Sequence, residues 1–581
     1  MDDFMQPARA FLDWFSAWPG TTFHDDIEIV DLRDRGAGRG IVAKRDIPVD
    51  TVLFTIPRKA IISTTTSELG TLLPSIVQVP DDQNEDEDDE EKDVESPSEQ
   101  DAWTSLILVM IYEFLRGSQS PWKPYFDVLP AVFDTPMFWT DDELRELQAS
   151  PVVGRVGHAE ADKMIRIKVL AFMRIYSNIF FGRTGVPTLG DDEIMELAHR
   201  MGSTIMAYSF SLEKDEDDEG SGSAAKTEEQ EDVEMDDGND VANERQNGEE
   251  HKHGPDCDHD HGHDSDDDSD NDLSGWVEDK DDKLPLGMVP MADMLNADAE
   301  CNAHIAHGVD VLTATAIRPI RAGDEILNYY GPLSNGELLR RYGYTTEKHA
   351  FFDAVDVPWP LLQNSLAKQL QLQPAEAAKA AAAAEADEFE DPFMLDREFD
   401  EDEETGQLKA PEGCTSSTML SELPPMLVRQ ARAFIKVALR QQQKRREKAL
   451  ASAPKSKQTG KNGKNSKSQT PPKTEKELVA AGLAHALKER LDQYPTSLQQ
   501  DRELLASGSV APGSRLHSAL RVRIGEKGLL TEAIALAKKM EVDARDEAKA
   551  AAKADKDASK TKKSERRGDD DNQASGKRQK R

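Results

Sequence analysis

Long apolar runs are missing from this 581-residue chain, and the longest is the stretch Leu106 to Tyr112. A membrane-spanning helix needs about 20 apolar residues. The first residues include Asp2 and Asp3, where a secretory signal would carry basic residues. We therefore expect a soluble, intracellular protein.

Cysteine is scarce as well. The three cysteines, Cys257, Cys301 and Cys414, are far apart, and Cys257 lies in an acidic stretch. This arrangement offers neither a disulfide framework nor a Cys-rich zinc site. We expect no redox chemistry.

Basic residues are too few to balance the acidic ones, since 71 Lys and Arg against 111 Asp and Glu give a net charge of −40. Three segments hold all of this excess: 81–100, 213–272 and 385–404 carry −11, −22 and −11, which leaves +4 on the remainder. Such segments are too polar to bury a core. We predict disordered acidic inserts at 81–100 and 213–272 within a globular protein that is nearly neutral.

Histidines gather in the second acidic insert, where residues 251–263 hold five of the 13 in the protein. This composition is compatible with zinc, but no apolar residues are present to fix a geometry. We predict a solvated spacer or a loose metal sink, and no metal site.

The apolar pattern predicts an α+β fold. Short β-branched runs between glycines and prolines over 27–63 predict a compact all-β meander, and similar runs over 286–331 predict further strands. Between them, apolar residues at three- and four-residue spacing predict helices, including one over 161–181 and one over 191–206. The β-rich domain is thus split by a helical insertion.

Composition and periodicity together give the domain boundaries. The predicted divisions are the split domain at 1–360 with its insertion at about 103–212, an acidic low-complexity linker at 361–423, an all-α domain at 424–540 with a Lys-rich linker at 444–476, and a basic tail at 541–581.

The glycine run Gly36-Ala37-Gly38-Arg39-Gly40 could be taken for a phosphate-binding loop. Such a loop leads into a helix, whereas both flanks here have β character. Taken alone, the run favours a hairpin turn whose glycines allow close backbone approach to a ligand.

Two later motifs, read in order with the glycine run, carry a family resemblance. They are Asp293-Met294-Leu295-Asn296 and the stretch from Gly323 to Gly343, which contains Asn328-Tyr329-Tyr330-Gly331. The ordered set resembles the split SET domain of the Rubisco-methyltransferase-like protein lysine methyltransferases, most of all the fungal ribosomal lysine N-methyltransferases of the large-subunit type. Trp122-Lys123-Pro124-Tyr125 resembles the inserted helical region of that group, and Gln493-Tyr494-Pro495 resembles its C-terminal substrate-binding domain.

The resemblance implies S-adenosylmethionine-dependent N-methylation of a protein lysine. It assigns Tyr330 as the active-site tyrosine, whose hydroxyl lies near the transferring methyl group and orients the amine. Ala297 departs from the histidine that the family usually has. The donor-binding positions that the resemblance implies are Ala37, Gly38, Arg39, Tyr208, Asn296, Ala297 and Tyr330.

The residue types suit this chemistry. Methyl transfer from a sulfonium to an amine requires aligned reactants and exclusion of water. The lysine, with a reference pKa of about 10.4, must arrive neutral, which a desolvated channel favours. Four of the nine tyrosines, at positions 329, 330, 342 and 344, could wall such a channel.

The expected substrate is a lysine of a ribosomal protein. The alternatives are histones or other nuclear proteins, or a non-catalytic acidic module that binds basic proteins. We expect a monomer that binds neither membranes nor nucleic acid directly. The basic clusters at 560–567 and 577–581 contain no aromatic residue to stack on bases and fit a bipartite import signal, so we predict the nucleus, and also the cytoplasm.

Overall fold

The computed structural model describes residues 4–35, 37–77, 101–212, 285–384, 391–401, 408–411, 419–452 and 473–576. The predicted inserts at 81–100 and 213–272, the histidine-rich stretch and the second basic cluster lie outside these ranges. No helix within them is long and apolar enough to cross a membrane. Within the same ranges, no three His, Cys, Asp or Glu side chains gather where they could hold a metal ion.

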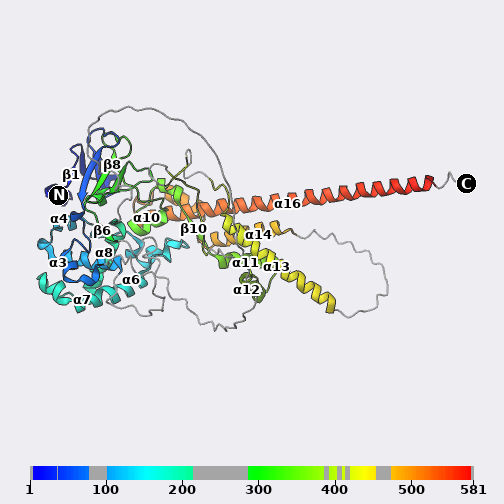
Figure 1. Cartoon of the computed structure of the whole chain (residues 1–581), viewed down its shortest axis with the longest axis horizontal. Coiled ribbons are helices and arrows are strands. Elements are labelled where there is room, and N and C mark those ends of the chain that lie inside the picture. The colour runs from blue at the N-terminus through cyan, green and yellow to red at the C-terminus, as the bar shows by residue number, and fades with distance from the viewer. Residues whose placement is uncertain are drawn as a thin grey trace, which may run out of the picture.

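Strands from both ends of the split domain pair with one another, which confirms the split (Figure 1). One sheet has the order β1-β4-β8-β7 and another has the order β2-β3-β9. In the first, Phe54 of β4 is paired with Ala314 of β8, and in the second Ile41 of β3 is paired with Ile326 of β9. The strands are β1 (Thr22–Phe23), β2 (Ile27–Asp31), β3 (Arg39–Ala43), β4 (Val52–Pro57), β7 (Ala303–His307), β8 (Val311–Ala316) and β9 (Glu325–Ile326).

The predicted all-β meander over 27–63 is therefore wrong in its connections. β3 and β4 are consecutive in the chain, but they lie in different sheets and each pairs with a strand from beyond the insertion. The burial pattern of β8 fits this pairing, because Leu312, Ala314 and Ala316 are buried while the residues between them are more exposed. When β8 pairs with β4, its apolar face is directed toward the core.

The inserted helices share one hydrophobic core with these sheets, so the insertion is not a separate domain. The central helix α3 buries twelve of its 15 residues, and the side chain of Asp101 accepts a hydrogen bond from the Thr104 amide at 2.6 Å to cap its N-terminus. The helices of this part are α1 (Gln6–Ala17), α2 (Glu68–Leu72), α3 (Ala102–Arg116), α4 (Lys123–Phe126), α5 (Asp141–Arg145), α6 (His158–Met164), α7 (Ala171–Ile175) and α8 (Asp191–Tyr208).

The single helix predicted over 161–181 is interrupted. π-Helical turns at Ile165–Leu170 and Asn178–Arg183 separate α6 from α7 and end the segment. A wider turn shifts the apolar positions slightly, which a pattern of three- and four-residue spacings does not detect. A short ladder of β5 (Ser209–Ser211) and β6 (Leu286–Met288) then joins the end of α8 to the second half of the domain.

A second hydrophobic core belongs to the C-terminal helices. It is built around the packing of α14 on α16 and α11, with the two-stranded ladder of β10 and β11 beside it. The elements from residue 335 onward, not all of which enter this core, are α10 (Asn335–Tyr342), β10 (Val355–Val357), α11 (Trp359–Leu370), α12 (Pro374–Ala382), β11 (Phe393–Leu395), β12 (Asp400–Glu401), β13 (Leu408–Lys409), α13 (Pro425–Ser452), α14 (Glu475–Leu491), α15 (Leu498–Ala506) and α16 (Arg515–Gly576).

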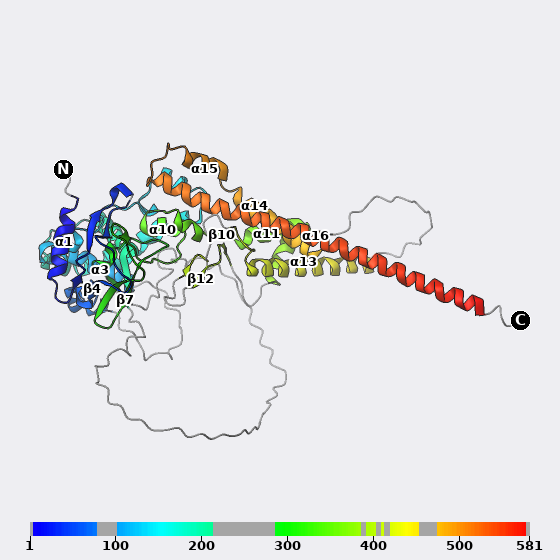
Figure 2. The same ribbon diagram turned by 90° about the horizontal axis from the view of Figure 1, so that it is seen from above.

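Three of the predicted boundaries need correction here. The supposed acidic linker at 361–423 contains most of α11 and all of α12 and β11, and β11 buries Phe393 and Leu395 completely. Average composition concealed these short apolar patterns among the acidic residues. The Lys-rich linker at 444–476 begins as the end of α13, and the basic tail at 541–581 continues α16 as far as Gly576. Ala, Lys and Glu have high helix propensity, which explains the extension. Figures 1 and 2 show the end of α16 projecting beyond the other helices.

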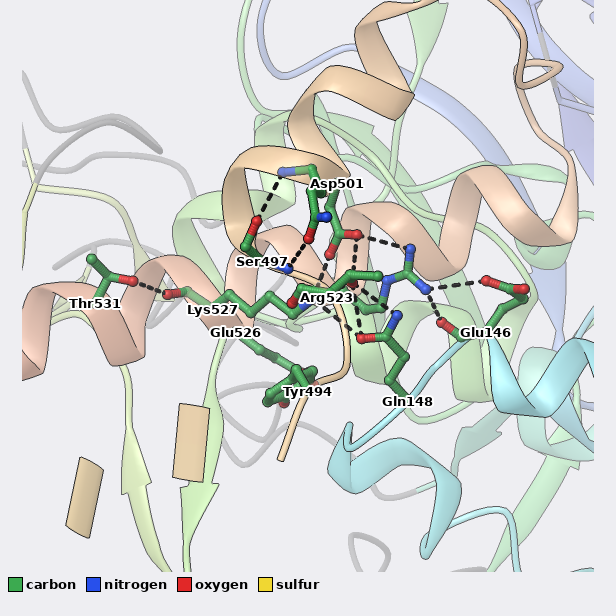
Figure 3. Close-up of polar contacts among 11 residues, drawn as sticks. Glu146, Gln148, Tyr494, Ser497, Asp501, Arg523, Glu526, Lys527 and Thr531 are labelled. Atoms are coloured by element: carbon green, nitrogen blue, oxygen red, sulfur yellow. Dashed lines mark hydrogen bonds and ion pairs between the residues drawn. The ribbon is translucent and has the colours of Figure 1, made fainter. Parts of the chain in front are cut away.

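A buried ionic network fixes the C-terminal helices to the insertion (Figure 3). Asp501 of α15 accepts hydrogen bonds from Lys527 at 2.5 Å and from Arg523 at 3.1 Å, and all three side chains are at most 2% exposed. Arg523 also donates to the Glu146 carbonyl oxygen at 2.6 Å, and Lys527 donates to Gln148 at 3.2 Å. Because Glu146 and Gln148 belong to the insertion, the network links the two cores.

We expect Asp501→Ala to lower the free energy of unfolding by roughly 3–5 kcal/mol, because it removes the buried carboxylate that Lys527 and Arg523 share. Glu547→Ala is the matched control on α16, since it breaks an ion pair with Lys476 in which both side chains are more than half exposed. It should cost less than about 1 kcal/mol. Denaturant unfolding measures both, and equal small losses would contradict a supporting role for the network.

Candidate functional site: the Asn296 turn and the tyrosine cluster

The glycine segment forms a tight loop just before β3. The Leu32 amide donates to the Gly38 carbonyl oxygen at 2.9 Å, and the Ala37 amide donates to the Leu32 carbonyl oxygen at 3.1 Å. A Cβ atom added to Gly38 would meet nothing within 4 Å. The backbone of the loop is therefore open on this side and accessible to a ligand.

Asn296 ties this segment to the second half of the domain. Its Nδ2 donates to the Arg39 carbonyl oxygen at 3.1 Å and to Glu325 Oε1 at 2.7 Å. The backbone carbonyl oxygen of Asn296 accepts a hydrogen bond from the backbone amide of Asn328 at 2.8 Å, and Ala297 forms a parallel β-bridge with Asn328. The structure thus brings the predicted site residues Arg39, Asn296 and Ala297 together.

Gly40 makes this approach possible. A Cβ atom there would lie 2.9 Å from Asn296 Nδ2, 2.7 Å from Glu325 Oε1 and 2.5 Å from Leu32 Cδ1. All three distances are shorter than real Cβ contacts, so these side chains would have to move if residue 40 carried a methyl group.

The side chain of Arg39 is engaged away from Asn296. It donates to the Phe4 carbonyl oxygen at 2.8 Å and to the Val128 carbonyl oxygen at 3.3 Å, and its guanidinium lies 4.1 Å from the centre of the Phe4 ring. Both terminal nitrogens of its guanidinium are thus already engaged.

Tyr330 lies in a cluster of phenols that are distant in the sequence. Its hydroxyl donates to the Leu295 carbonyl oxygen at 3.0 Å, and its ring stacks on Tyr342 with centroids 4.6 Å apart. The Tyr342 ring in turn lies 6.2 Å from that of Tyr344. Tyr208, the last residue of α8, lies near enough to Tyr342 for the two to interact electrostatically.

Burial keeps these phenols neutral. It raises the pKa of Tyr342 to about 12 and the pKa of Tyr330 well above its ordinary value. It also raises the pKa values of Tyr208 and Tyr344. At neutral pH the phenols are uncharged, and the desolvation around them disfavours a protonated amine.

Sequence reasoning missed the pair formed by Tyr125 and Asp293. The Tyr125 hydroxyl donates to Asp293 Oδ2 at 2.5 Å, between α4 and the turn that carries Asn296. Each residue belongs to a motif that carried the family resemblance. Nothing in the sequence joined the two motifs, because 168 positions separate them.

Family comparison agrees with this geometry. The sequence model of the SET domain matches residues 38–331, just over half of the chain. The chain belongs to the SET-domain family. A second model, described as Rubisco LSMT substrate-binding, matches residues 398–530 and so begins before the helical domain that we predicted at 424.

Individual relatives of this SET-domain protein are lysine methyltransferases by name. Ribosomal lysine N-methyltransferase 4 of Saccharomyces cerevisiae is 29% identical over 368 residues, which are 63% of this chain and 60% of that protein. N-lysine methyltransferase SETD6 of Homo sapiens is 26% identical over 315 residues, which are 53% of this chain and 48% of that protein. The chain thus matches about half to three-fifths of the length of these relatives.

Solved structures confirm the fold. The structure of Rubisco LSMT bound to AdoMet has a TM-score of 0.52 at 17% identity and covers 93% of both chains. The crystal structure of the SET domain of LSMT bound to lysine and AdoHcy has the same TM-score at 18% identity, with 93% of this chain and 92% of that chain covered. The expected split SET domain with a helical C-terminal domain is therefore confirmed.

We expect Gly40→Ala to lower the free energy of unfolding by about 1–3 kcal/mol, because the new methyl group overlaps Asn296 and Glu325. Gly38→Ala in the same loop is the control: its methyl group enters open space, so stability should be unchanged or slightly increased. Thermal unfolding without ligand separates the two, and equal melting temperatures would show that Asn296 does not need this close approach.

Proposed function

We propose that this SET-domain protein is an S-adenosylmethionine-dependent protein-lysine N-methyltransferase that modifies a ribosomal protein. The observation that carries the proposal is the convergence of the open glycine loop, the Asn296 turn and Tyr330 beside a neutral tyrosine cluster. The names of the relatives support lysine as the acceptor, and the yeast relative supports a ribosomal target.

The residues present fit the donor. The loop of Ala37, Gly38 and Arg39 has open space at Gly38, where an added Cβ atom would meet nothing within 4 Å, and Tyr208 borders the phenol cluster. Buried polar atoms near this cluster lack a hydrogen-bond partner among the described residues, namely Asp293 Oδ1 and the Tyr344 hydroxyl. Ala297 offers only backbone contacts and methyl packing where the family usually has histidine. The donor, when bound, supplies an activated methyl group.

The protein positions the acceptor and excludes water. Neutral phenols at Tyr330, Tyr342 and Tyr344 favour the uncharged amine of the substrate lysine over its ammonium form. The Tyr330 hydroxyl is anchored on the Leu295 carbonyl oxygen, so its oxygen has a fixed direction for orienting that amine. A strong nucleophile or base from the protein is not required, because the reaction is a direct displacement.

The substrate test is incubation of the full chain with labelled donor and ribosomal subunits, followed by mass spectrometry of the labelled band. We expect a methylated lysine in a large-subunit protein. Labelling of core histones instead would redirect the proposal to other nuclear proteins. Absence of saturable donor binding would favour the non-catalytic module for basic proteins.

Nuclear import through the basic clusters stays a prediction, and the first cluster lies on α16.

Tyr330→Phe should lower turnover by roughly 10²-fold, because the hydroxyl that orients the amine is lost while the ring remains. Donor affinity should change little. Tyr112→Phe is the control, since its hydroxyl faces Glu68 at 3.4 Å and lies outside the phenol cluster. Initial rates at saturating donor give the answer, and wild-type turnover in Tyr330→Phe would refute the role.

Asn296→Ala should weaken donor binding by roughly 5- to 150-fold, which corresponds to about 1–3 kcal/mol. The reason is that both hydrogen bonds from Nδ2 hold the glycine loop against Glu325. Calorimetric titration with S-adenosylmethionine measures the change. Ala297→His, which restores the usual family residue, should tighten binding or leave it unchanged. Equal affinity of Asn296→Ala and wild type would mean that the turn has no part in donor binding.

A further inference from the structure

Asp293 carries a buried acceptor oxygen that no described residue satisfies. Tyr125 donates to its Oδ2 at 2.5 Å, while Oδ1 is buried without a hydrogen-bond partner among the described residues. An unsatisfied carboxylate oxygen in the interior costs free energy. Such a group in a native fold calls for an explanation.

The turn that carries Asp293 is also strained. Met291, two residues earlier, is fully buried and has φ +81°, a left-handed conformation that side chains other than glycine rarely adopt. Strain of this kind persists only where the surrounding structure imposes it, and it is concentrated at functional sites. One short turn thus combines a strained backbone with an unsatisfied carboxylate.

The carboxyl group faces the phenols of the site. Burial raises the pKa of Asp293 to about 7, and the hydrogen bond from Tyr125 acts in the opposite direction. The titratable groups beside it are Tyr125 of α4, Tyr208 of α8 and Tyr330 after β9, and the carboxyl raises the pKa of all three. Above about pH 7 the uncharged cluster therefore has one negative charge beneath it.

We propose that Asp293, held by Tyr125, is the buried counter-charge of the site and favours a cationic donor over its neutral product. This inference rests on the proposed methyltransferase function. In the transfer the sulfur–methyl bond breaks with its electron pair left on sulfur, the amine nitrogen forms the new bond and then carries the charge, and the nitrogen proton has already gone to solvent. Asp293 takes no part in these bond changes, so it is a positioning residue.

A negative charge beside Tyr208 and Tyr330 would have a specific consequence for exchange of ligands. S-adenosylmethionine carries a sulfonium charge, whereas S-adenosylhomocysteine has a neutral thioether. The two differ only by the methyl group on sulfur and the charge that it brings, so a change in the ratio of their affinities with pH or on substitution of Asp293 reports the effect of the charge. Ionised Asp293 should retain the donor and release the spent product.

The test is calorimetric titration of the full chain with each of the two nucleosides at pH 8 and pH 6. We expect Asp293→Asn to lower the preference for S-adenosylmethionine by about tenfold at pH 8. In the wild type this preference should fall between pH 8 and pH 6, as the carboxylate is protonated, and in Asp293→Asn it should be the same at both. Tyr125→Phe removes a hydrogen bond that favours the ionised form, so the fall should move to higher pH.

Stability separates this role from a structural one. Because the pKa of folded Asp293 lies above the ordinary value of 3.8, the folded state binds a proton more tightly than the unfolded state, and the contribution of this group to stability falls between about pH 4 and pH 7. Asp293→Asn should therefore keep or raise the melting temperature at pH 8. A structural role would lower it.

Tyr494→Phe is the matched control, because it breaks another buried pair, in which the phenol donates to Glu526 at 2.7 Å in the second core. It should leave the ratio of affinities unchanged. An unchanged ratio in Asp293→Asn would overturn the inference while the methyltransferase proposal stands. If the wild type binds neither nucleoside, the proposed function fails, and this inference fails with it.

Discussion

The side-chain amide of Asn296 holds the two halves of the SET domain together where they form the site. One hydrogen bond reaches the Arg39 carbonyl oxygen in the first half, and the other reaches Glu325 in the second. Gly40 leaves the space for this contact, and the adjoining Leu295 carbonyl oxygen anchors Tyr330. The glycine loop, the Asn296 turn and the tyrosine cluster all depend on this closure.

The insertion contributes to the same site through Tyr125. Its hydroxyl meets Asp293 on the turn before Asn296, so α4 helps to fix the position of that turn. The shared core holds α4 in a fixed position relative to that turn, because the inserted helices and both sheets pack around one hydrophobic core. Burial of a carboxyl group beside neutral phenols costs electrostatic free energy. The strained backbone at Met291 adds a separate conformational cost.

The C-terminal helices are held against the insertion by the charges around Asp501. A small apolar cluster beside them joins Trp139 and Val152 of the insertion to Leu339 of α10 and to Ala519 of α16. Since α10 follows directly after Tyr330, these contacts give the helical domain a fixed relation to the tyrosine cluster. A substrate held by that domain would meet the site in a defined orientation.

The amino-acid sequence by itself determined the fold class and the split of the β domain, and it singled out the motifs that the structure gathers around Asn296 and Tyr330. Alternation in β8 and helical spacing in α3 are local signals, and the order of the glycine, Asn296 and Tyr330 motifs specified the family. The acidic residues around Phe393 and Leu395 hid a strand, because average composition cannot reveal two buried positions. Only the tertiary structure decided that β3 and β4 lie in different sheets and that Tyr125 meets Asp293. Strand partners and buried hydrogen bonds depend on which distant segments share a core, and this is not encoded in local spacing.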